Sequence, residues 1–163
     1  MNSPLPKYSG RGNRLRLDRL WLEELKERGF LYLTPASRSQ APDIFYKAIK
    51  EFNESKFWEC HDTLEKLWLV TPYPMRLFYQ GLIKVAVGFY HVQQNNPRGG
   101  ISKLSQGLDL MKQMPPTLLG VDVESLWYNS MRLLDGLKRP QYERYGQSVL
   151  FPKIVLIDTR EVR

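Results

Sequence analysis

The sequence predicts an all-α protein: an antiparallel bundle of about five or six helices followed by an extended C-terminal tail. Apolar residues recur at helical spacing in six successive segments. Proline or glycine interrupts the pattern between the segments. From Val149 onward, short β-like runs replace the helical pattern. Amphipathic helices with short connections favour antiparallel neighbours around a shared core.

The first two helices are expected on either side of a proline-containing connector. Apolar residues recur at helical spacing between 15 and 28, and Gly29 follows where a helix would end. After the connector at 30–41, Pro42 suits the first position of the second helix. The apolar stripe of this second helix contains Ile44, Phe45, Ala48, Ile49 and Phe52.

The third and fourth helices are expected to form a hairpin. The third runs from Ser55 to about Leu69, and the proline-rich segment 71–74 separates it from a fourth helix at about 75–94. Between Leu77 and His91 the fourth helix has a single charge, on Lys84. A helix so poor in charge is covered on nearly all sides, so we place it at the centre of the bundle.

Two further helices and the tail complete the predicted fold. Asn96 and Pro97 suit the N-cap and first position of the fifth helix, which ends by the Pro115-Pro116 pair. Asp122 is expected to cap the sixth, whose apolar residues are Leu126, Trp127, Met131, Leu134 and Leu137. The predicted organisation is a flexible basic N-terminus at 1–14, a helical bundle at 15–140 and an extended tail at 141–163.

The apolar tail residues Val155-Leu156-Ile157 are expected to be buried against protein, and two arrangements would bury them. The tail lies against its own bundle, or it is exchanged with a second subunit. The second arrangement makes a homodimer one of the expected partners, beside a protein partner that the sequence does not identify.

Composition and charge exclude several classes of protein. The single cysteine, Cys60, excludes an internal disulfide framework and a multi-thiolate zinc site. No apolar run reaches the length of a membrane span, and the start lacks the pattern of a secretory signal, so a soluble cytoplasmic protein is expected. The formal charge of +7 comes mainly from the two ends. Nucleic-acid binding through the basic N-terminus is therefore a remote alternative, because no recognition motif accompanies the charge.

A histidine and a glutamate share one side of the third helix. His61 and Glu65 are four residues apart, so their side chains can reach a common point. They lie at the shoulder of the apolar arc, between Trp58 and Trp68, where partial burial is expected. Asp62, Lys66, Glu59 and Thr63 are assigned to the solvated face. Such a pair suits metal binding or proton transfer, and it equally suits a buried hydrogen bond that fixes packing.

The fourth helix supplies the expected neighbours of this pair. Folding the hairpin about residue 72 places Gln80 and Lys84 near His61 and Glu65. His91 would lie about 12 Å further along the axis, too far to share one metal ion with His61. Gly81 and Gly88 are interpreted as packing residues that let another helix approach closely.

Two blocks of sequence resemble the domain of unknown function 309 family, over about residues 43–113. The first has the pattern H-x-x-x-E-x-x-W at His61, Glu65 and Trp68. The second is similar to the family's Q-G-L-I-x-x-A helix, and an N-x-x-G turn at Asn96 follows it. The resemblance implies a small helical bundle and suggests that the histidine and glutamate bind metal, but it brings no activity.

The sequence departs from the family pattern at two positions. Ser55 stands where the family usually has glycine, and Asp62 stands where glutamate commonly follows the histidine. The shorter aspartate side chain reduces the reach of a carboxylate at that position.

The preferred interpretation is a non-enzymatic interaction module with a buried His/Glu polar site. The alternative is a protein that binds a divalent metal ion through His61 and Glu65, with hydrolysis as the associated chemistry. In either case Trp58, Trp68, Gln80, Lys84 and His91 are the expected supporting residues. No catalytic residue and no organic cofactor site is assigned.

Overall fold

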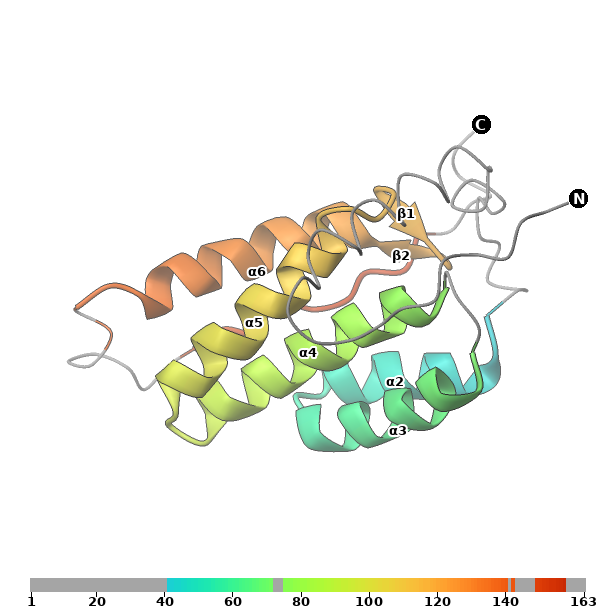
Figure 1. The fold of residues 1–163 in the computed structure, drawn as a ribbon, viewed down its shortest axis with the longest axis horizontal. Coiled ribbons are helices and arrows are strands. Elements are labelled where there is room, and N and C mark those ends of the chain that lie inside the picture. The colour runs from blue at the N-terminus through green and yellow to red at the C-terminus, as the bar shows by residue number, and fades with distance from the viewer. Residues whose placement is uncertain (1–40, 72–74, 141, 143–148, 158–163) are drawn as a thin grey trace, which may run out of the picture.

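A computed structural model of the full chain describes residues 41–71, 75–140, 142 and 149–157. The helices in these residues are α2 (Asp43–Asn53), α3 (Phe57–Val70), α4 (Met75–Gln93), α5 (Pro97–Met111) and α6 (Val123–Leu137). Figure 1 shows them side by side, and the predicted all-α bundle is confirmed. The helix predicted over 15–28 and the basic N-terminus lie outside the described residues.

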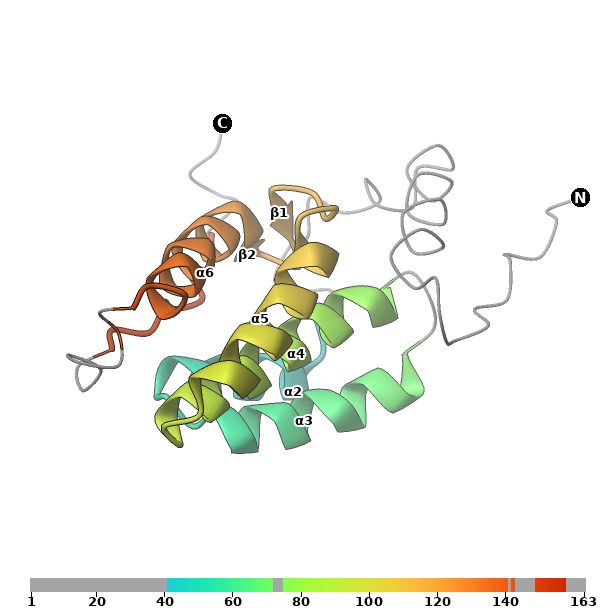
Figure 2. The ribbon, with the colours of Figure 1, turned by 60° about the vertical axis from the view of Figure 1, so that its left-hand side comes forward.

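Helix α4 occupies the centre of the bundle. It packs against α3 on one side and α5 on the other, while α2 packs on α3 and α6 packs on α5 (Figure 2). From Met75 to Val92 every residue is buried or half-buried, as the scarcity of charge predicts. None of the described helices is long and apolar enough to cross a bilayer.

Helices α4 and α5 approach so closely that their contact requires glycine. A Cβ atom on Gly88 would lie 2.9 Å from the backbone nitrogen of Leu104. A Cβ atom on Gly107 would lie 2.9 Å from the carbonyl oxygen of Gly81. Neither clash could be relieved by a side-chain movement, because the opposing atoms belong to the backbone. The predicted packing role of Gly81 and Gly88 is therefore confirmed.

Side-chain caps fix the starts of two helices where the sequence predicts them. The Asn96 side chain accepts a hydrogen bond from the backbone N–H of Gly99 at 3.0 Å. The Asp122 side chain accepts one from the N–H of Ser125 at 2.9 Å. Pro42 is the N-cap of α2 and not its first residue, because its ψ of 152° is extended. The predicted start was thus wrong by one position.

The third helix starts later than expected. It begins at Phe57, two residues after the predicted start at Ser55. Ser55 itself has a φ of 60°, in the left-handed region that residues with a Cβ atom rarely adopt. This conformation turns the chain between α2 and α3, and glycine would adopt it without strain.

A two-stranded hairpin that the sequence analysis missed precedes α6. Strand β1 (Thr117–Leu118) pairs antiparallel with β2 (Val121–Asp122). Its two-residue loop has φ values of 50° at Leu119 and 75° at Gly120, as a type I′ turn requires. Strands of two residues are too short to give a recognisable alternation of apolar and polar residues.

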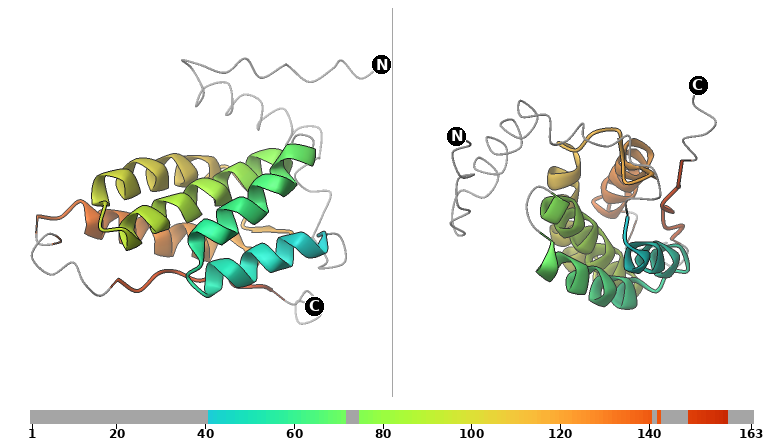
Figure 3. Two further views of the ribbon diagram at one scale, coloured as in Figure 1. Left: turned by 90° about the horizontal axis from the view of Figure 1, so that it is seen from below. Right: turned by 90° about the vertical axis from the view of Figure 1, so that its right-hand side faces the viewer.

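The described tail, residues 149–157, lies along its own bundle. It runs beside α2 (Figure 3), and Leu156 forms an antiparallel bridge with Val121. Of the two predicted arrangements, the structure has the tail against its own bundle. Its cover is incomplete, because Leu150 is 93% exposed and Val155 is 52% exposed.

Four phenylalanine rings from four parts of the chain meet in the core. The Phe57 ring lies 5.2 Å from that of Phe52, 5.3 Å from that of Phe89 and 4.9 Å from that of Phe151. The Phe57–Phe52 and Phe57–Phe89 pairs meet edge to face, which aromatic rings favour. The cluster joins α2, α3, α4 and the tail directly beneath the first turn of α3.

Candidate metal-binding site on helix α3

One imidazole and two carboxylates gather on the outer side of α3. Among the described residues, His61, Asp62 and Glu65 are the group whose ligand atoms all lie within 4.8 Å of one another. His61 Nδ1 is 3.2 Å from Asp62 Oδ1, and His61 Nε2 is 3.8 Å from Glu65 Oε2. The helix produces this grouping, because residues four apart project from one face and Asp62 is the next residue in the chain.

The three side chains differ in exposure. The His61 side chain is 17% exposed, whereas those of Asp62 and Glu65 are 56% and 52% exposed. Burial of the histidine is confirmed, but the expected burial of Glu65 is wrong. The carboxylate reaches past the rim of the apolar surface into solvent, as long charged side chains do.

The His61 ring has an unsatisfied polar atom. Its Nδ1 is buried and has no hydrogen-bond partner. Asp62 Oδ1 lies 3.2 Å from this nitrogen without forming a hydrogen bond to it. A buried polar atom without a partner costs free energy. A cation placed beside it would remove that cost.

An aromatic row flanks the histidine. The Trp58 ring lies 4.7 Å from the His61 ring and 4.9 Å from the Tyr90 ring. His91 follows Tyr90, at 6.3 Å between ring centres. The two histidines are thus at opposite ends of the row, which supports the prediction that they do not share one metal ion. Trp58 is 47% exposed, so it shields one side of the imidazole only.

The other predicted supporting residues do not join the pair. Trp68 instead carries the guanidinium of Arg76 on its ring, 4.0 Å from the ring centre. Lys84 Nζ donates to Gln106 Oε1 on α5 at 2.7 Å. Among the described residues, no ion pair links Lys84 to Glu65, and no hydrogen bond links Gln80 to the site. Folding the hairpin about residue 72 predicts only the position of a residue along the helix axis, and the rotation of α4 about its axis decides that Lys84 reaches α5.

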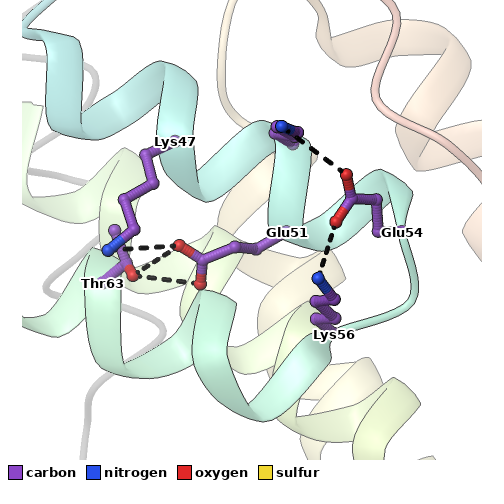
Figure 4. Close-up of polar contacts among 6 residues, drawn as sticks. Lys47, Glu51, Glu54, Lys56 and Thr63 are labelled. Carbon is purple, nitrogen blue, oxygen red and sulfur yellow. Dashed lines mark hydrogen bonds and ion pairs between the residues drawn. The ribbon is translucent and has the colours of Figure 1, made fainter.

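A second polar cluster, between α2 and α3, was missed. Thr63 is buried although the sequence analysis assigned it to the solvated face, and its hydroxyl donates to the Glu51 carboxylate (Figure 4). Lys47 Nζ lies 3.9 Å from the same carboxylate. Cys60 is buried nearby, and burial raises the pKa of its thiol well above the ordinary range. This cluster faces the helix interface, so it fixes packing and offers no open ligand position.

A site with one imidazole and two half-exposed carboxylates can hold a divalent cation. Its nitrogen and oxygen donors suit ions such as Mn²⁺, Fe²⁺, Co²⁺ and Zn²⁺. The ring nitrogen Nδ1 of His61 is buried without a hydrogen bond, and a neutral imidazole nitrogen can bind a cation. Three protein ligands also leave coordination positions open.

Comparison with known proteins confirms the family resemblance predicted from the sequence, over α2, α3, α4 and the start of α5. Residues 45–102 match the model of the family described as Domain of unknown function (DUF309). An uncharacterized protein of Aquifex aeolicus (strain VF5) is 26% identical over 86 residues, which cover 52% of this chain and 26% of the relative. Uncharacterized protein YpuF of Bacillus subtilis (strain 168) is 26% identical over 117 residues, which cover 71% of this chain and 64% of the relative. Both matches therefore span less than two thirds of the relative's length.

Proposed function

We propose that this protein binds a divalent metal ion through His61, Asp62 and Glu65. The observation that carries the proposal is the convergence of three ligand atoms within 4.8 Å, one of them from a buried imidazole. Water, Gln80, Glu59 and Asp62 are the groups that could complete the predicted pair, and the geometry favours Asp62. On a helical wheel Asp62 points away from His61, which made it a poor candidate for a shared ligand. Its side chain nevertheless bends back toward the ring of the neighbouring residue His61.

The proposed site is open to solvent on its carboxylate side. Both acids are about half exposed, so a bound ion would keep positions for water or for an anionic ligand. Metal-bound water is the group that metal-dependent hydrolysis uses. Hydrolysis is accordingly the activity that the site would permit, and metal binding is the function proposed.

Metal titration of the full chain tests the proposal. The dialysed protein is titrated with Zn²⁺, Mn²⁺ or Co²⁺ by calorimetry, and the visible absorption of Co²⁺ reports on its ligands. The chain contains only two histidines, which provides a matched pair of variants. We expect one equivalent to bind to the wild type and to His91→Gln, and none to His61→Gln. Equal binding by His61→Gln, or no binding by the wild type, would overturn the proposal.

The non-enzymatic interaction module predicts a different result for the same variant. If His61 only orders the bundle, its replacement lowers the free energy of unfolding by about 1–3 kcal/mol in metal-free buffer. If it is a metal ligand, the metal-free variant is as stable as the wild type, and added metal no longer raises its melting temperature. The half-exposed ring of Trp58 supports an interaction surface at this position.

The remaining proposals concern location and nucleic acid. A cytoplasmic location stays a prediction from the sequence. Nucleic-acid binding would depend on the arginine-rich start, which lies outside the described residues. Its test is the salt dependence of affinity for RNA or DNA, because an electrostatic contact weakens steeply as salt is raised.

A further inference from the structure

The tail is held by a side chain that recognises extended backbone. Asn53, the last residue of α2, pairs with Ile154 in both directions. Ile154 N–H donates to Asn53 Oδ1 at 2.7 Å, and Asn53 Nδ2 donates to the Ile154 carbonyl at 2.9 Å. A carboxamide that pairs in this way acts like the edge of a neighbouring strand.

The tail also forms an isolated antiparallel bridge with β2 of the hairpin. The backbone N–H of Asp122 donates to the carbonyl of Val155 at 2.9 Å, and that of Ile157 donates to the carbonyl of Gly120 at 2.7 Å. These bonds flank the bridge between Val121 and Leu156. Two backbone bonds and an antiparallel register are what strand addition to a sheet edge requires.

The side chains of Phe151 and Ile154 anchor the tail in the core. The Phe151 ring lies 4.9 Å from that of Phe57 and 5.3 Å from that of Phe89. Ile154 is 4% exposed and belongs to the core. The groove therefore recognises an extended segment with Phe and Ile three residues apart, through backbone bonds and two apolar positions.

The tail contacts residues that precede it in the chain: Asn53 of α2, strand β2 and the rings of Phe57 and Phe89. These contacts join residues separated by as many as 101 positions in the chain, so docking does not depend on local structure within the tail. Between the end of α6 at Leu137 and Val149 lie residues 138–148, which could span about 35–40 Å if fully extended. A linker of this reach allows the same segment to dock on another body.

We propose that the groove between α2 and β2 also accepts residues 149–157 of a second copy, so that two chains exchange tails in a two-fold dimer. A second copy carries the identical ligand, which the structure shows to fit the groove. The apolar side chains of Leu150 and Val155 stay exposed on the docked tail, and the surface of a second body can cover them. This proposal is independent of metal binding.

Cysteine pairing across the bridge tests the exchange. Val121 and Leu156 form a non-hydrogen-bonded pair, in which the Cβ atoms are close enough for a disulfide. In a Cys60→Ala background, the full-length Val121→Cys and Leu156→Cys proteins are purified separately, mixed and mildly oxidised. Exchange predicts a disulfide-linked dimer that contains one copy of each variant, with a yield that rises with protein concentration.

Two controls make the result decisive. The matched control replaces Leu156→Cys with Leu150→Cys, a highly exposed tail position away from the bridge, and it measures random collision. The double variant Val121→Cys/Leu156→Cys shows that the pair can be oxidised at all. Mixed dimers several-fold above the control support exchange. An internal cross-link in the double variant, with mixed dimers no more abundant than in the control, would overturn it and leave each tail on its own bundle.

A weaker groove should reduce the exchange. Asn53→Ala removes both bonds to Ile154, so we expect fewer mixed dimers from a Val121→Cys partner that also carries this change. Circular dichroism checks that the helices remain folded. An unchanged yield in a folded Asn53→Ala protein would contradict recognition of the tail by this groove.

Discussion

The Thr63 hydroxyl on α3 faces both oxygens of the Glu51 carboxylate on α2, at 2.9 and 3.1 Å. Thr63 is 5% exposed and Glu51 is 9% exposed, so the contact is shielded from water. A buried carboxylate needs such partners, because an unsatisfied charge in an apolar interface is strongly unfavourable. This contact joins α2 to α3, whereas the ion pair of Lys47 with Glu51 lies within α2.

Thr63→Val should lower the free energy of unfolding by about 1–3 kcal/mol, since it removes a donor from a buried charge and keeps the side-chain volume. Urea denaturation followed by circular dichroism measures the change. Lys47→Met is the control, because Lys47 is mostly exposed and its ion pair spans 3.9 Å. Its loss should cost less than about 1 kcal/mol. Equal costs for the two variants would contradict this account.

Gly88→Ala should destabilise the bundle by about 1–3 kcal/mol, because the new methyl group would press on the backbone of Leu104. Gly136→Ala is a matched control in α6, with no atom within 4 Å of the added methyl group. That variant should be neutral or more stable by up to about 1 kcal/mol. Thermal unfolding of both proteins measures the difference. A stable Gly88→Ala protein would show that α4 and α5 can move apart at little cost.

Ser55→Gly should stabilise the protein by about 0.5–1 kcal/mol. Glycine adopts the φ of 60° without the strain of a Cβ atom, and the gain exceeds its larger loss of chain entropy. Ser55→Ala keeps the Cβ atom and should bring no gain. Chemical denaturation of the three proteins decides the matter, and a stabilised alanine variant would point to a cause other than backbone strain.

The Cys60 thiol should react slowly with thiol reagents in the native protein. It is 1% exposed, and burial raises its pKa, so little reactive thiolate is present at pH 8. Labelling with a chromogenic disulfide reagent should be complete within minutes in denaturant and far slower without it. Rapid labelling of the folded protein would show that α3 opens readily.

Sequence reasoning located the helices well because their signals are local. The caps at Asn96 and Asp122 and the apolar stripe of α2 each depend on a few adjacent residues. The hairpin before α6 escaped detection, because strands of two residues have no usable periodicity. Where the tail lies depends on Asn53, a residue about one hundred positions earlier in the chain.

The candidate site was predicted only in part, because only contacts within one helix follow from the spacing of residues. His61 and Glu65 share a helix face, and their spacing alone brings them together. The place of Asp62 depends on how its side chain turns, and that of Lys84 depends on the rotation of α4. Burial of Thr63 depends on α2 crossing above it. None of these is fixed by spacing along one helix.

The chain order of the helix contacts has a consequence for how the protein folds. Each helix packs mainly on the next one, so the bundle can assemble from neighbours with short loops to close. The bonds between Asn53 and Ile154 instead join residues 101 positions apart, so forming them before the helices have packed would cost more chain entropy. We therefore expect the tail to arrive last, on a bundle that is already formed. Until the tail docks, the groove between α2 and β2 can bind residues 149–157 of a neighbouring chain. Refolding at high protein concentration would therefore favour tail exchange over docking within one molecule.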